Sequence, residues 1–195
     1  MIKLNKKLIL ASNSPRRKDI LTQAGFDFEV KIKDVEEIYP EEMLPQNVPE
    51  YLAYIKAKPF INESFNNVIL TADTVVLLDN KILGKPKNLD NARTMLNSLS
   101  GAIHKVVSGV CILNDEKFTT FSDRTDVHFR KLTLEEIDFY LDIYKPLDKA
   151  GSYGIQEWIG MIGVEKIIGS YYNVMGLPIH LIYNQLYKFR LNNVI

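Results

Sequence analysis

Apolar runs and amphipathic stretches alternate from the beginning of the chain. Residues 6–11, KKLILA, predict a short buried strand. Residues 15–24 carry apolar positions at helical spacing, with Ser14 placed to cap the helix and Gly25 to end it. Residues 26–32, FDFEVKI, alternate apolar and polar positions as a half-buried strand does. This order of strand, helix and strand is typical of an α/β protein.

The next part of the chain predicts a helix and then a hairpin. Residues 48–65 have a helical pattern, which Pro59 is expected to kink or to end early. Residues 67–86 predict a strand that breaks at residues 73–74 and then turns back at residues 79–80, Asp-Asn.

The second half of the chain continues the same mixture. Residues 88–101 predict a helix capped by its first residue, and residues 133–144 one that begins with a Thr–Glu capping box. Between them lie two long β runs, residues 103–113 and 117–130, and a last helix starts at Pro178. With no internal repeat or linker, we expect one mixed α/β domain over the whole chain, with two closely packed lobes.

Composition narrows the classes of function. Of 195 residues, 24 are basic and 24 acidic, so the net charge is zero and general nucleic-acid binding is not expected. No apolar run approaches the roughly 18 residues of a membrane span, and no secretory signal is visible. The single cysteine, Cys111, lies among apolar residues and is expected to be a buried structural thiol rather than a nucleophile. We expect a cytoplasmic protein without membrane attachment.

The first turn of the first helix has an unusual charge. Arg16, Arg17 and Lys18 stand at the positive end of the helix dipole, where anions are preferred. Ser12 and Ser14 supply hydroxyls beside backbone N–H groups that have no partner within the helix. The segment is either a phosphate site or a helix start whose arginines extend into solvent.

Other polar residues have two interpretations each. Asp73 ends an apolar run and could bind Mg²⁺ or orient a water molecule, or simply cap a turn. Lys56 and Lys85 are either phosphate contacts or solvated charges, and Glu37 is either a metal ligand or a solvated loop carboxylate. Gln156 carries a donor and an acceptor on one amide, which suits the edge of a nucleobase, or it faces water.

Several common sites are excluded by missing motifs. The sequence has no G-x-x-x-x-G-K-[ST] loop, no G-x-G-x-x-G fingerprint and no G-x-S-x-G elbow. Its three histidines are isolated from one another and from the cysteine, so a zinc site is not expected.

Six motifs occur in a fixed order and together resemble the Maf family of nucleoside triphosphate pyrophosphatases. They are LASNSPRR, TADTVV, GKPKN, LSGAIHKVVSGV, DKAGSYGIQ and GSYYNVMGLP. The resemblance implies an α/β fold like that of inosine triphosphate pyrophosphatases, a mixed sheet with flanking helices and two lobes around a central cleft. It also implies a homodimer that hydrolyses a nucleoside triphosphate to the monophosphate and pyrophosphate with a divalent cation, Mg²⁺ or Mn²⁺.

Within that family the chain looks like the dTTP/UTP-specific subgroup. Arg16, Thr74 and Gln156 match the residues near the base that mark this subgroup. Two positions depart from the usual pattern: Thr71 replaces a smaller residue before the ADT motif, and Glu157 follows the glutamine where glycine is common. These departures concern the shape of the base pocket.

The resemblance also assigns roles. Asp73 is implied as the proton acceptor that activates water and as a contact of the metal. Glu37 is a second candidate metal ligand from its chemistry, since Mg²⁺ bridges phosphate oxygens to carboxylates. Because cleavage of the α–β anhydride places charge on phosphate oxygens, hydroxyls and cations are the suitable partners of the triphosphate: Ser12, Ser14, Arg16, Arg17, Lys56 and Lys85. Two alternatives remain: a non-catalytic nucleotide-binding regulator of cell division, and a broader enzyme that removes modified or non-standard nucleotides.

Overall fold

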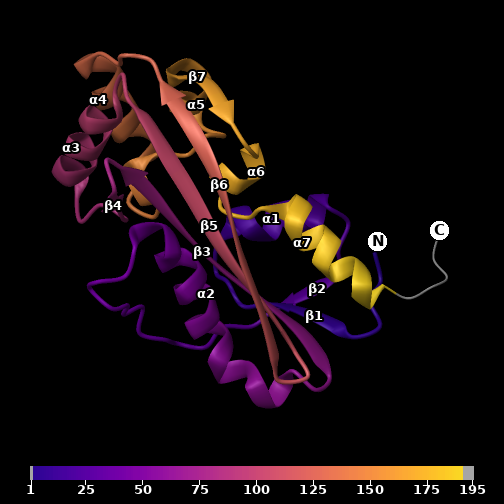
Figure 1. The fold of residues 1–195 in the computed structure, drawn as a ribbon. Coiled ribbons are helices and arrows are strands. Elements are labelled where there is room, and N and C mark those ends of the chain that lie inside the picture. The colour runs from indigo at the N-terminus through magenta and orange to yellow at the C-terminus, as the bar shows by residue number, and fades with distance from the viewer. Residues whose placement is uncertain (1, 191–195) are drawn as a thin grey trace. The chain divides into compact units, whose positions relative to one another are not determined.

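The computed structural model describes residues 2–190, which form a mixed α/β fold (Figure 1). The strands are β1 (Lys7–Leu10), β2 (Phe28–Val30), β3 (Asn67–Leu78), β4 (Lys81–Leu83), β5 (Ile103–Asn114), β6 (Lys117–Phe129) and β7 (Val164–Ile168). The α-helices are α1 (Pro15–Gln23), α2 (Val48–Ala57), α3 (Leu89–Leu99), α4 (Leu134–Tyr144), α5 (Trp158–Gly163), α6 (Tyr171–Val174) and α7 (Ile179–Leu186). Short 3₁₀ segments are Pro45–Asn47, Lys58–Glu63, Ala150–Ser152 and Tyr187–Phe189.

The strands hydrogen-bond in the order β2-β1-β3-β5-β6-β7, with β4 beside β3. β1 is parallel to β2 and β3, whereas β4 is antiparallel to β3 and β7 to β6. The predicted mixed sheet with flanking helices is therefore confirmed. No helix within residues 2–190 has the length and apolar character that crossing a bilayer requires.

The chain divides into two compact units. Unit 1 comprises residues 1–73, 108–123 and 176–195, and unit 2 comprises residues 74–107 and 124–175. Strands β3, β5 and β6 contribute residues to both units.

The core of unit 1 lies between α2 and the strands. Ile9 of β1 pairs in register with Ile69 of β3, and both are buried with Ala53 and Ala57 of α2. Cys111 belongs to the same cluster, and burial raises the pKa of its thiol to about 12. The expected structural role of this cysteine is therefore confirmed.

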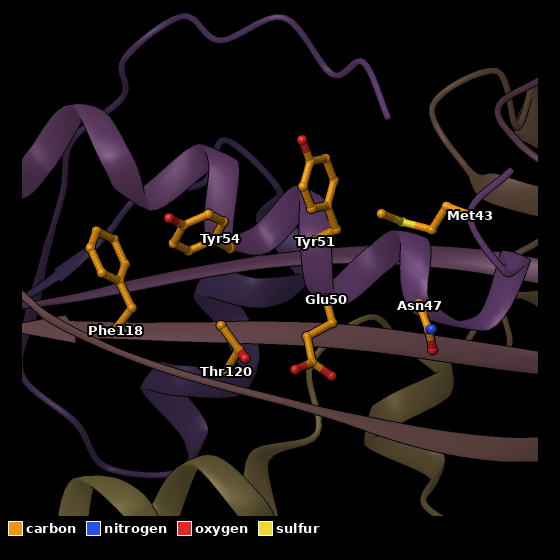
Figure 2. Close-up of a pocket in the computed structure, with 7 residues that line it drawn as sticks. All are labelled: Met43, Asn47, Glu50, Tyr51, Tyr54, Phe118 and Thr120. Atoms are coloured by element: carbon orange, nitrogen blue, oxygen red, sulfur yellow. The ribbon is translucent and has the colours of Figure 1, made fainter. Parts of the chain in front are cut away.

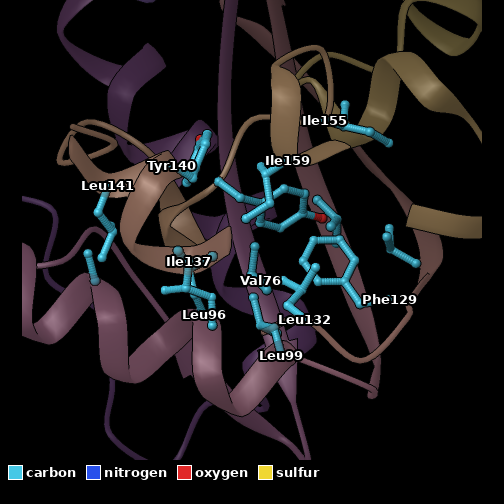
Figure 3. Close-up of a cluster of buried hydrophobic side chains, with 14 residues drawn as sticks. Val76, Leu96, Leu99, Phe129, Leu132, Ile137, Tyr140, Leu141, Ile155 and Ile159 are labelled. Atoms are coloured by element: carbon cyan, nitrogen blue, oxygen red, sulfur yellow. The ribbon is translucent and has the colours of Figure 1, made fainter. Parts of the chain in front are cut away.

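The core of unit 2 joins α3, α4 and α5 to the strands (Figure 3). Leu96 and Leu99 of α3 meet Ile137 and Tyr140 of α4 in one buried cluster. Ile155, in the loop before α5, is buried in the same cluster, so this loop is anchored to the core.

Local signals gave most helix ends and turns correctly. Asn88 accepts a hydrogen bond from the Asn91 N–H, and Thr133 forms the full capping box of α4. Asp79 and Asn80 both have positive φ, as the turn between two twisted antiparallel strands requires.

Two predictions about local structure were wrong. β3 runs without a break through Asp73 and Thr74, because buried apolar residues on both sides extend one strand. Ser14 makes no side-chain capping bond at the start of α1; its backbone N–H instead donates to Ser12 Oγ at 3.3 Å.

Candidate active site

The start of α1 presents three cations. Arg16, Arg17 and Lys18 occupy its first turn, which contains no acidic residue. The hydroxyl of Ser12, which is buried, lies between the backbone N–H of Ser14 and the guanidinium of Arg17. The structure therefore brings Ser12, Ser14 and Arg17 together in unit 1, as expected of an anion site.

Arg17 is fixed by backbone carbonyls. Its Nη1 donates to Ala72 O at 2.8 Å and to Ser12 Oγ at 3.2 Å, and its Nε donates to Gly176 O at 2.9 Å. Burial lowers the pKa of Arg17 and the nearby Asp73 raises it. The guanidinium remains charged at neutral pH and is held in the protein rather than extended into solvent.

Asp73 and Glu37 share one lysine. Lys56 Nζ lies 2.6 Å from Asp73 Oδ1 and 3.0 Å from Glu37 Oε1. The Asp73 side chain is 14% exposed, whereas that of Glu37 is 54% exposed. The three predicted residues thus form one ionic cluster in unit 1, with an enclosed carboxylate that water still reaches.

Thr71 ties the helix that carries Lys56 to the strand that carries Asp73. The buried Oγ1 of Thr71 donates to Ala53 O of α2 at 2.6 Å and contacts Cys111 O at 3.4 Å. This explains why threonine is accommodated before the ADT motif: its hydroxyl is hydrogen-bonded within the core. Thr71 therefore links α2, which carries Lys56, to β3, which carries Asp73.

Asp73 and Glu37 offer carboxylate oxygens, which are the donors that hard divalent cations prefer. Within residues 2–190, no group of three or more His, Cys, Asp or Glu side chains forms a ready-made metal site. Mg²⁺ commonly uses one or two carboxylates together with substrate phosphates. Asp73 and Glu37, which converge on Lys56, supply this oxygen-only donor set.

The remaining predicted residues belong to unit 2 and lie on separate elements. Thr74 is half-buried in β3, and Lys85 is exposed in the segment after β4. Gln156 is exposed in a turn immediately before α5. The exposed position leaves the Gln156 amide accessible to a ligand.

Sequence reasoning missed the groups that hold these residues. The carbonyls of Ala72 and Gly176 fix Arg17, but a backbone carbonyl has no side-chain signature. Gly176 lies in the GSYYNVMGLP motif, so the sequence marked this position but not the role of its carbonyl. In the sequence, Glu157 stood out only because it replaces the glycine that is common after the glutamine. In the structure, this neighbour of Gln156 accepts a hydrogen bond from the Tyr140 hydroxyl.

A surface pocket of about 540 Å³ in unit 1 contains none of the predicted site residues (Figure 2). Glu50, Tyr51 and Tyr54 of α2 line it together with Phe118 of β6. Lys56, on the same helix, instead contacts Asp73. The pocket is therefore separate from the ionic cluster.

Comparisons with known proteins agree with the geometry. The family profile described as Maf-like protein matches residues 7–189. A dTTP/UTP pyrophosphatase of Phocaeicola vulgatus is 51% identical over 93% of this chain and 95% of its own length. A dTTP/UTP pyrophosphatase of Porphyromonas gingivalis is 48% identical, with 96% of each chain covered. The Staphylococcus aureus Ham1 protein shares the fold at a TM-score of 0.55 and 16% identity, covering 94% of this chain and 99% of its own.

Proposed function

Because the chain belongs to the Maf family, we propose that it hydrolyses dTTP and UTP to the nucleoside monophosphate and pyrophosphate. It is then a hydrolase acting on a phosphoanhydride bond, as the names of relatives about half identical in sequence support. The observation that carries the proposal is the Asp73–Lys56–Glu37 cluster in the same unit as the cationic start of α1.

The triphosphate is assigned to cations and to backbone N–H groups. Arg16 and the positive end of the α1 dipole suit phosphate oxygens, and Ser12 and Ser14 add hydroxyls. Arg17 contributes positive charge, while its N–H groups donate to the carbonyls of Ala72 and Gly176. Lys56 supplies a compact positive charge next to Asp73. Lys85 is assigned to the phosphates on the resemblance alone.

Asp73 is proposed to accept the proton of the attacking water. The water oxygen bonds to the α-phosphorus, the bond from the α-phosphorus to the α–β bridging oxygen breaks, and pyrophosphate leaves with the electron pair. Charge that grows on phosphate oxygens is stabilised by fixed cations. A divalent cation, Mg²⁺ or Mn²⁺, held by Asp73 and Glu37 would neutralise phosphate charge further.

Base selection is assigned to Gln156 and Thr74, with Arg16 also contributing. The Gln156 amide offers one acceptor and two donors, which complement the mixed donor and acceptor edge of uracil and thymine. A homodimer and a cytoplasmic location remain predictions from the resemblance and the composition.

The test is product analysis with UTP and Mg²⁺. Wild type is expected to release UMP and pyrophosphate, and Asp73→Asn to bind UTP while losing 10²- to 10⁴-fold in turnover, as removal of a general base does. Asp19→Asn, at an exposed position on α1, is the matched control. Release of UDP and phosphate would contradict the reaction, and near-wild-type turnover by Asp73→Asn would remove Asp73 from the base role.

A further inference from the structure

Gln156 is presented by a closed turn. The Glu157 N–H donates to Gly154 O at 3.0 Å, which makes Gln156 the third residue of a four-residue turn. Ile155, directly before Gln156, is buried in the core of unit 2. The turn therefore points one side chain inward as an anchor and leaves the next one exposed.

One buried hydroxyl bonds both ends of this turn. The Gly154 N–H donates to Tyr140 Oη at 3.1 Å, and the Tyr140 hydroxyl donates to Glu157 Oε2. A Cβ at Gly154 would lie 2.8 Å from Glu157 Cδ, closer than real Cβ contacts allow. A larger residue at this position would therefore displace the Glu157 carboxylate from the turn.

Glu157 is itself held on two sides. Its second oxygen, Oε1, lies 3.1 Å from Nζ of the buried Lys149. Its backbone carbonyl accepts the N–H groups of Gly160 at 2.9 Å and Met161 at 3.2 Å, which begins α5. The residue after Gln156 is therefore fixed by an ion pair and by a helix start.

Tyr140 is held by its own helix as well as by its bonds to this turn. It is fully buried on α4, whose first turn has a capping box formed by Thr133 and Glu136. Arg130 makes two hydrogen bonds to the Glu136 carboxylate, at 2.6 and 3.0 Å. The hydroxyl that bonds both ends of the turn therefore belongs to a buried residue of a helix whose start is held by a capping box and an ion pair.

We propose that Tyr140 and Glu157 are positioning residues that fix the Gln156 turn and so set the preference for pyrimidine nucleotides. The inference rests on the proposed function. Neither residue touches the nucleotide; each acts through Gln156, whose amide must be held in place to recognise one base edge over another.

The test compares the kinetics of UTP and ATP hydrolysis in Glu157→Ala, Glu157→Gln and Tyr140→Phe. For Glu157→Ala and Tyr140→Phe we expect KM for UTP to rise about tenfold, with kcat for UTP and KM for ATP changing less than about threefold. Glu157→Gln keeps an oxygen that accepts from Tyr140, so its preference for UTP over ATP should be within about threefold of wild type.

Glu135→Gln, exposed on α4, and Tyr144→Phe, stacked on Tyr140, are the matched controls and should keep the wild-type UTP:ATP preference. A wild-type preference in Tyr140→Phe would overturn the inference. An equal loss of activity toward UTP and ATP, in proportion to the folded fraction measured by circular dichroism, would also overturn the inference. An inactive wild-type protein would instead overturn the proposed function on which the inference depends.

Discussion

His104 in unit 2 is a buried imidazole with a defined partner. Its Nε2 lies 2.7 Å from the Tyr153 hydroxyl, and its ring packs edge-on against Phe129. The side chain is almost inaccessible, and within residues 2–190 its Nδ1 has no hydrogen-bond partner. Burial first, and then the charge of His128, lowers the pKa of His104 from 6.5 to about 4.

This lowered pKa predicts a pH-dependent stability. The unfolded chain binds a proton at His104 below its ordinary pKa of 6.5, whereas the folded protein does so only near pH 4. Above about pH 6.5, His104 is neutral in both the folded and the unfolded protein and costs no stability. As the pH falls toward 4, the free energy of unfolding decreases by roughly 3 kcal/mol, because only the unfolded chain takes up the proton readily. Urea unfolding between pH 4 and 7 measures the effect.

Two variants separate this histidine from the carboxylates, which titrate in part of the same range. His104→Gln should flatten the loss between pH 6.5 and 4, since glutamine does not titrate. Tyr153→Phe removes the partner but keeps the buried imidazole, so it should retain the loss. An unchanged pH profile in His104→Gln would show that His104 is not its source.

At the scale of elements, the start of α2 lies directly on β5. A Cβ at Gly109 of β5 would lie 2.1 Å from Glu50 N and 2.2 Å from Pro49 C. The close approach of two backbones is possible only with glycine. It sets the position of α2, the helix from which Lys56 contacts Asp73.

Gly109→Ala is therefore expected to destabilise unit 1 severely. The added methyl group overlaps backbone that cannot move without displacing α2, so we expect a loss of about 3 kcal/mol or more in the free energy of unfolding. Gly84→Ala is the control, because a Cβ at Gly84 meets nothing within 4 Å. Thermal unfolding of both variants measures the difference, and equal melting temperatures would contradict the close packing.

Elements were predictable where the signal was local. The caps at Asn88 and Thr133 and the turn at Asp79–Asn80 depend on neighbours within a few residues, and all were identified correctly. The break expected at Asp73 was wrong, because a polar residue in a long strand cannot be distinguished by pattern from a residue that ends it. Ser14 was a plausible cap, but its side chain makes no capping bond, and its own backbone N–H donates to the hydroxyl of Ser12.

At the scale of the whole molecule, the ordered motifs predicted the fold class and the family. The TADTVV motif marked Asp73, whereas Lys56 and Glu37 were candidates from their charge alone, and the structure joins the three in one cluster. The acceptors of Arg17 could not be predicted, since Ala72 and Gly176 lie 55 and 159 residues away along the chain. Such contacts depend on tertiary packing, which a periodic pattern does not encode.

The proposed function specifies both a reaction and a preference for the bases uracil and thymine. The most direct test is pyrophosphate release from the eight common NTPs and dNTPs, each with Mg²⁺ and the wild-type protein, expressed as kcat/KM. We expect UTP and dTTP to exceed the other six by about tenfold or more, the discrimination that a few hydrogen bonds to the base supply. Turnover of none of the eight would favour a non-catalytic nucleotide-binding regulator. Equal turnover of purines and pyrimidines would favour a broader nucleotide-removing enzyme and contradict selection by Gln156.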